Sequence, residues 1–153
     1  EWSYEQYFER LKGYDETRSI DFRQLMFPDT VATLQAALDG GYRVALASSG
    51  NMKAIENVLS ICELEHYFEL VMSGEMFKES KPHPDIYLTT AERLGLQPEQ
   101  CVAIEDSALG IRSAVAAGMT AIAIRDRYFG IDQSMAHHIV NSLTEAMELV
   151  RGM

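Results

Sequence analysis

The stretch Cys101-Val-Ala-Ile-Glu-Asp-Ser107 decides the fold. Four apolar residues are followed by two carboxylates, Glu105 and Asp106, and then by Ser107, a residue type common at helix N-caps. A short apolar run that opens into a helix is typical of a buried parallel strand. Open α/β sheets place their functional sites at the carboxyl ends of such strands. The sequence therefore predicts that the acidic pair lies at the functional edge of a sheet.

Two interpretations of Glu105 and Asp106 stay open on these residues alone. Adjacent carboxylates at the edge of a buried sheet repel each other, and a divalent cation relieves that repulsion. Mg²⁺ suits such a place because it prefers oxygen ligands and takes one or two protein carboxylates together with substrate oxygens. Alternatively, the pair belongs to a solvated acidic loop that caps the next helix.

Short apolar strands alternate with helices from residue 29 to the end of the chain. We expect strands at 42–47, 70–72, 101–104, 120–124 and 138–140, and helices that begin at Asp29, after Asn51, at Pro84, at Ser107 and at Ser142. Asp29 is expected to cap the first of these helices. This alternation predicts an α/β fold with a doubly wound parallel sheet.

An aromatic-rich piece precedes this α/β body. Tyr4, Tyr7 and Phe8 fall on one face of an expected helix over residues 3–11, and a faint change in composition follows near residue 26. We therefore divide the chain into a helical piece, residues 1–25, and an α/β body, residues 26–153.

Composition excludes several classes of function. The net charge is −10 and no basic run is present, which argues against binding to nucleic acid. No apolar run approaches the roughly 20 residues of a membrane span, and no basic signal-peptide region opens the chain. Cys62 and Cys101 lie in apolar surroundings without CxxC spacing, so we expect free thiols in a reducing compartment. These features fit a cytoplasmic enzyme.

Three strand or loop ends carry polar side chains that a parallel sheet would bring to one edge. Ser48 and Ser49 follow the strand at 42–47, Lys81 lies in a loop stiffened by two prolines, and Glu105 and Asp106 follow the strand at 101–104. Taken singly, each has an ordinary explanation: a serine that caps a helix, a solvated lysine, an acidic loop. Together, hydroxyls, an ammonium and two carboxylates at one edge predict a site for phosphate and Mg²⁺.

Three motifs resemble motifs II, III and IV of the haloacid dehalogenase-like hydrolases, and more narrowly those of the β-phosphoglucomutase-like phosphatases. They are Val44-Ala-Leu-Ala-Ser-Ser-Gly50, Ser80-Lys-Pro-His-Pro-Asp85 and Ile104-Glu-Asp-Ser-Ala-Leu-Gly-Ile111, the last continuing to Ala116-Ala-Gly-Met119. The resemblance covers roughly residues 25 to 150, and the order and separation of the motifs make it specific.

The resemblance implies a Rossmann-like core and Mg²⁺-dependent phosphoryl transfer through an aspartyl-phosphate. The substrate would be a small phosphorylated metabolite, such as a sugar phosphate. By position, Ser48 would donate a hydrogen bond to the transferring phosphoryl group, and the backbone of Ser49 would assist. Lys81 would neutralise developing charge and steady the nucleophile, and Glu105 and Asp106 would help to hold Mg²⁺.

The sequence departs from the family at the nucleophile, which belongs to an Asp-x-Asp motif at the end of the first strand. No two aspartates in this sequence are separated by one residue; Asp29-Thr30 mimics the tail of the motif, but Phe27 stands at the nucleophile position. The resemblance thus implies that the first strand, central in the sheet, is missing, and that residues 1–25 are the remnant of a helical cap domain. We expect a fragment of a larger enzyme, whose first strand would come from a separate N-terminal segment of the same enzyme.

The leading interpretation is the C-terminal portion of a Mg²⁺-dependent phosphatase or phosphomutase. A phosphonate hydrolase or dehalogenase of the same fold is an alternative, although dehalogenation does not require the metal that Glu105 and Asp106 suit. A catalytically inactive binding or assembly module is a third. The absent nucleophile favours this last alternative, whereas the retained Ser48, Lys81 and acidic pair oppose it.

Overall fold

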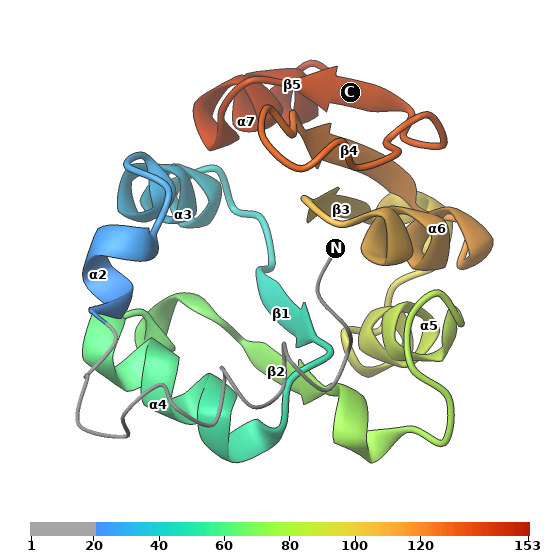
Figure 1. Cartoon of the computed structure of the whole chain (residues 1–153), viewed down its shortest axis with the longest axis horizontal. Helices are drawn as coiled ribbons and strands as arrows, with labels where there is room; N and C mark the ends of the chain where they lie inside the picture. Colours follow the sequence, from blue (N-terminus) through green and yellow to red (C-terminus); the bar gives the residue numbers. More distant parts are fainter. Residues whose placement is uncertain (1–20) are drawn as a thin grey trace, which may run out of the picture.

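The computed structural model describes residues 21–153, in which helices alternate with strands from residue 30 onward, except that the last two strands follow each other with no helix between them (Figure 1). The helices are α2 (Phe22–Leu25), α3 (Thr30–Asp39), α4 (Met52–Cys62), α5 (Asp85–Arg93), α6 (Ala108–Ala116) and α7 (Leu143–Arg151). The strands are β1 (Ala45–Ser48), β2 (Leu70–Ser73), β3 (Val102–Glu105), β4 (Thr120–Ile124) and β5 (His138–Val140). The helix expected at 3–11 and most of the piece 1–25 lie outside the described residues.

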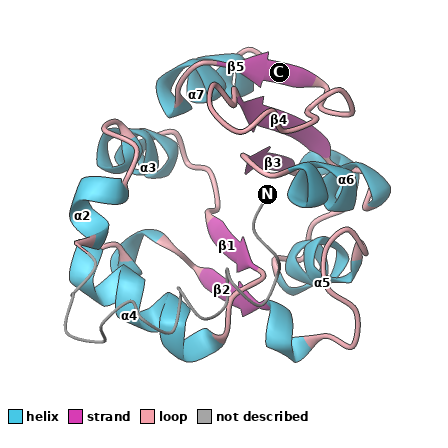
Figure 2. Cartoon of the chain, viewed as in Figure 1, coloured by secondary structure: helices cyan, strands magenta, loops and turns pink. Residues whose placement is uncertain are grey.

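Every described strand pairing is parallel, which confirms the predicted α/β class. The strands form two sheets, one with the order β1-β2 and one with the order β3-β4-β5 (Figure 2). Pairing of β1 begins where Ala45 lies opposite Leu70, so the strand starts later than the predicted residue 42. Within residues 21–153, no strand pairs with the second edge of β1 or of β3. These two open edges line the same cavity.

Helices cover both faces of the strands, as expected for a doubly wound arrangement. The main core combines α5 and α6 with one face of the strands of both sheets; its most deeply buried members include Met72, Ala91, Ile111, Ala114 and Ala121. On the opposite face, α4 packs on the β1-β2 sheet and α7 packs on β4. The core beneath α5 and α6 therefore holds the two sheets together.

The sequence of β4 explains why it lies between two helical layers. Ala121 and Ala123 face the main core, and Ile122 and Ile124 face α7. Successive side chains of a strand point to opposite faces, so a strand that is apolar at every position is buried on both. The small alanines allow α6 to approach closely, while the isoleucines fill the space beneath α7.

Side-chain caps fix the starts of the site-bearing helices. The Ser107 hydroxyl accepts a hydrogen bond from the Gly110 amide at 3.0 Å, and Ser142 caps α7 through the Glu145 amide at 3.1 Å. Asn51 caps α4 by accepting from the Ala54 amide at 2.8 Å. Each cap satisfies an amide that would otherwise have no partner in the first helical turn.

Asp29 was predicted to cap its own helix, but its carboxylate bonds to a different helix. Asp29 occupies the N-cap position of α3 but makes no side-chain bond there. Its carboxylate instead accepts hydrogen bonds from the amide and the hydroxyl of Thr144, both at 2.8 Å, in the first turn of α7. Burial alone would raise the pKa of Asp29, but the Thr144 hydrogen bonds outweigh it and leave the pKa below its usual value.

We expect Asp29→Ala to lower the free energy of unfolding by about 1 kcal/mol at neutral pH, because the first turn of α7 loses a capping acceptor. Asp39→Ala is the control, since Asp39 is an exposed carboxylate that accepts only from Gln35 in its own helix. Urea denaturation measures both. Because the folded-state pKa of Asp29 is lowered, its contribution is present above the unfolded pKa and is lost as the pH falls through the folded value. Equal effects of the two substitutions would contradict this role for Asp29.

Candidate active site

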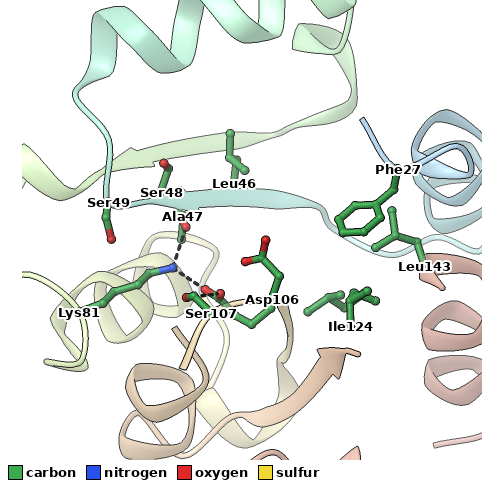
Figure 3. Close-up of a pocket in the computed structure, with 12 residues that line it drawn as sticks. Phe27, Leu46, Ala47, Ser48, Ser49, Lys81, Asp106, Ser107, Ile124 and Leu143 are labelled. Carbon is green, nitrogen blue, oxygen red and sulfur yellow. Dashed lines mark hydrogen bonds and ion pairs between the residues drawn. The ribbon is translucent and has the colours of Figure 1, made fainter. Parts of the chain in front are cut away.

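One cavity, of about 330 Å³, collects the residues that the sequence singled out (Figure 3). Its polar part is lined by Ser48, Ser49, Lys81, Glu105, Asp106 and Ser107, and its apolar part by Phe27, Leu46, Ile104, Ile124 and Leu143, with Ala47 between them. The predicted convergence of the two strand ends and the loop is therefore present in the structure.

Neither Ser48, the last residue of β1, nor Ser49 caps the following helix, so that simpler interpretation was wrong. Helix α4 begins at Met52 and is capped by Asn51. The Ser48 hydroxyl accepts from the Gly50 amide at 3.1 Å, which curls the chain back at the end of β1. Ser48 is half-buried and Ser49 is exposed, so this turn borders the polar part of the cavity.

Residues at the end of β2 contact this turn and hold it in place. The sequence analysis did not single them out. The fully buried Ser73 hydroxyl donates to the Gly50 carbonyl at 2.7 Å, and Glu75 accepts from the Met52 amide at 2.8 Å. A Cβ on Gly74 would lie 2.9 Å from the Ser49 carbonyl oxygen, so the two loops touch backbone to backbone. The polar run Ser-Gly-Glu directly after a buried strand was the available signal.

Lys81 is buried rather than solvated, and it bridges the two sheets. Its ammonium donates to the Ala47 carbonyl at 3.0 Å and to Glu105 Oε1 at 2.5 Å (Figure 3). The side chains of Lys81 and Glu105 are 8% and 9% exposed. Burial of two charges is offset only where they pair closely and their remaining hydrogen-bonding capacity is met, which these contacts achieve.

Tyr87 completes the ion pair, although its sequence position marked it only as a core residue of α5. Its hydroxyl donates to Glu105 Oε1 and accepts from the Lys81 ammonium at 3.1 Å. Lys81 Nζ also lies 4.7 Å from the centroid of the Tyr87 ring. Burial, followed by the negative charge of Glu105, raises the pKa of Tyr87, so the phenol stays neutral and keeps its proton.

Glu105 reaches Lys81 because Gly110 leaves room for it. Glu105 ends β3, and its carboxylate passes over the first turn of α6, where a Cβ on Gly110 would lie 2.0 Å from the carboxyl group. The Ser107 hydroxyl contacts the second carboxylate oxygen at 3.2 Å. The Glu-Asp-Ser-x-x-Gly spacing thus has a steric cause in this structure.

Asp106 differs from Glu105 in having an unengaged carboxylate. It is exposed, it makes no hydrogen bond or ion pair within residues 21–153, and Figure 3 shows it pointing into the cavity. No group of three or more His, Cys, Asp or Glu side chains in the described part could enclose a metal. Asp106 nevertheless fits Mg²⁺, which needs only one or two carboxylates beside water and substrate oxygens. Glu105 is its neighbour but is engaged by Lys81 and Tyr87.

A family comparison decides what kind of protein carries this arrangement. Residues 3–124 match the model of the haloacid dehalogenase-like hydrolases. The chain belongs to this family. The match agrees with the predicted resemblance and covers the three motifs around the cavity.

The relatives include two proteins that are named as phosphatases. Over 86 residues, 56% of this chain and 46% of the relative, the chain is 43% identical to the fructose-1-phosphate phosphatase YqaB of Escherichia coli K12. Over 110 residues, 72% of this chain and 47% of the relative, it is 35% identical to the hexitol phosphatase B of the same strain. The chain spans just under half the length of these curated relatives.

A solved structure supports the fold. The β-phosphoglucomutase of Clostridium difficile superposes with a TM-score of 0.75 at 24% identity, covering 85% of this chain and 56% of that one. At this identity the likeness concerns the fold alone. Separately, within the described residues no helix is both long and apolar enough to cross a membrane.

We expect Gly110→Ala to lower the free energy of unfolding by about 1–2 kcal/mol, because the new Cβ collides with the Glu105 carboxyl group. Helix propensity alone would predict a gain of up to about 1 kcal/mol for this change. Chemical denaturation of a double-mutant cycle with Glu105→Ala separates the two effects. In the Glu105→Ala background Gly110→Ala should be neutral or stabilising; an equal loss in both backgrounds would show that Glu105 is not the obstacle.

Proposed function

We propose that this chain provides most of the active site of a Mg²⁺-dependent phosphatase or phosphomutase that acts on a small phosphorylated metabolite, such as a sugar phosphate. The observation that carries the proposal is the gathering of Ser48, Lys81 and Asp106 around one cavity. Membership of the hydrolase family and the two sugar-phosphate phosphatases among its relatives support the substrate class.

Each polar group has a role in such a reaction. Ser48 donates a hydrogen bond to the phosphoryl group, the turn at Ser49 adds backbone donors, and Lys81 neutralises the charge that develops on the phosphoryl oxygens. Asp106 binds Mg²⁺. Glu105, which the sequence offered as a second metal ligand, is engaged by Lys81, Tyr87 and Ser107 and instead holds Lys81 in position. The metal, when bound, supplies electrostatic stabilisation of the transferred group. These groups position and stabilise, but none of them is the nucleophilic aspartate.

The nucleophile, on this proposal, arrives on a strand that is not part of these 153 residues. The sequence holds no Asp-x-Asp motif. Between the open edges of β1 and β3 lies the cavity, with Leu46 and Ile104 in its apolar part. An extended apolar segment placed there would pair with both edges and deliver an aspartate beside Lys81. We further propose that residues 1–25 are the remnant of a cap domain, and that the free thiols Cys62 and Cys101 reflect a cytoplasmic setting.

The decisive experiment measures phosphate release from sugar phosphates by the chain alone and together with a segment that carries an Asp-x-Asp strand. We expect turnover only for the combination, its loss on chelation of Mg²⁺, and a decrease of at least about 100-fold in kcat for Asp106→Asn or Lys81→Met. Asp39→Asn, remote from the cavity, is the control. Turnover by the chain alone would refute the need for an added nucleophile.

Two other outcomes separate the remaining classes. Halide release that is insensitive to chelation, or cleavage of a carbon–phosphorus bond, would assign the combined protein to a dehalogenase or a phosphonate hydrolase of the same fold. Binding of the strand segment with no turnover of any phosphate ester, and with no Mg²⁺ binding by calorimetry, would identify an inactive assembly module.

A further inference from the structure

All three N–H groups of Lys81 are used inside the protein. An ammonium carries three donors. In this structure they meet the Ala47 carbonyl, Glu105 Oε1 and the Tyr87 hydroxyl. A phosphoryl oxygen can therefore reach Lys81 only by replacing one of these acceptors.

The three acceptors differ in how readily they release the ammonium. Glu105 is charged and 9% exposed, so losing its hydrogen bond would leave a buried charge partly unpaired. The Ala47 carbonyl belongs to the open edge of β1 and has no strand partner on that side within the described residues. The Tyr87 hydroxyl is neutral, and it still donates to Glu105 after it stops accepting from Lys81. It is the acceptor whose replacement leaves no polar group unsatisfied.

We propose that Tyr87 is a positioning residue for phosphate recognition: its hydroxyl keeps Lys81 and Glu105 in place and holds one Lys81 N–H that an entering phosphoryl oxygen takes over. This inference rests on the proposed function, since it concerns the same cavity. No bond is made or broken in the exchange other than hydrogen bonds, and the phenol proton stays on Tyr87.

Removal of the Tyr87 hydroxyl should therefore change the hydrogen bonding of the Lys81 ammonium without disturbing the packing of α5. In Tyr87→Phe the ring still fills the core, where Tyr87 is 7% exposed, and it still faces the ammonium. The ammonium and the Glu105 carboxylate, however, have each lost one hydrogen bond, so Lys81 is held by two acceptors and its position is less well fixed. An entering phosphate must then order an ammonium that the wild-type hydroxyl already holds in place, and this weakens binding.

Tyr67 offers a matched control. It is also 7% exposed and packs between α4 and the β1-β2 sheet, and within the described residues its hydroxyl makes no hydrogen bond. Tyr67→Phe removes the same atom from an equally buried ring, away from the cavity.

The first measurement uses the chain without phosphate. In wild type and in Tyr67→Phe, we expect a resolved NMR signal from the Lys81 ammonium, because hydrogen bonding and burial slow its exchange with water. In Tyr87→Phe the signal should broaden or disappear. An unchanged signal would overturn the role of Tyr87, whatever happens with phosphate.

The second measurement titrates inorganic phosphate into the same proteins in the presence of Mg²⁺ and follows the Ser49 and Gly50 amides. We expect Tyr87→Phe to weaken binding about three- to tenfold, the range of one hydrogen bond, and Tyr67→Phe to leave it unchanged. In a Lys81→Met background the effect of Tyr87→Phe should vanish, because Tyr87 acts through Lys81. An equal effect in both backgrounds would indicate a purely structural residue. Failure of wild type to bind phosphate would count against the proposed function, a result separate from the ammonium signal.

Discussion

The buried contact of Lys81 with Glu105 is the interaction on which the site depends, because it joins two sheets whose facing edges share no strand within residues 21–153. Lys81 reaches the backbone of β1 on one side and the last residue of β3 on the other. A buried ion pair of this kind adds little to the free energy of unfolding. Loss of one partner, however, leaves an uncompensated buried charge, which strongly destabilises the fold. The pair therefore acts less as a source of stability than as a constraint on where the two strand ends can lie.

The same pair sets the electrostatics of the cavity. The charge of Glu105 neutralises that of Lys81. With Asp106, the three side chains together carry one net negative charge. A phosphorylated substrate brings further negative charge into this space. Without a cation the cavity would repel its proposed ligand, and Mg²⁺ beside Asp106 reverses the sign of the local field. The proposed metal is thus a condition for substrate binding as well as for the chemical step.

Sequence reasoning located the residues that depend on local pattern. The apolar run before Glu105 placed the acidic pair at a strand end, Ser107 caps its helix as predicted, and the helix expected to begin at Ser142 is present. Local sequence patterns cannot predict hydrogen-bond partners that are distant in the sequence and meet only when the chain folds. The carboxylate of Asp29 bonds to Thr144, 115 positions away, although its sequence context predicted a local cap.

Tyr87 and Ser73 were missed for the same reason. Tyr87 has the sequence position of a core residue, and Ser73 opens a short polar run. The partner of each hydroxyl is not visible in the sequence, because a neighbouring element brings the acceptor to it only on folding. The division into two sheets was likewise beyond local pattern, since β1 and β3 have the composition of strands that are paired on both sides. The absence of an Asp-x-Asp motif, with Phe27 at the position of its first aspartate, was what pointed to this gap.

Open backbone edges form hydrogen bonds with any extended segment, whatever its side chains. On the proposal that a separate segment fills this gap, discrimination between strands would come from the apolar part of the cavity, which Leu46, Ile104 and Leu143 line. Substitutions of these residues would then change which segment is accepted, while the backbone edges would accept any extended segment.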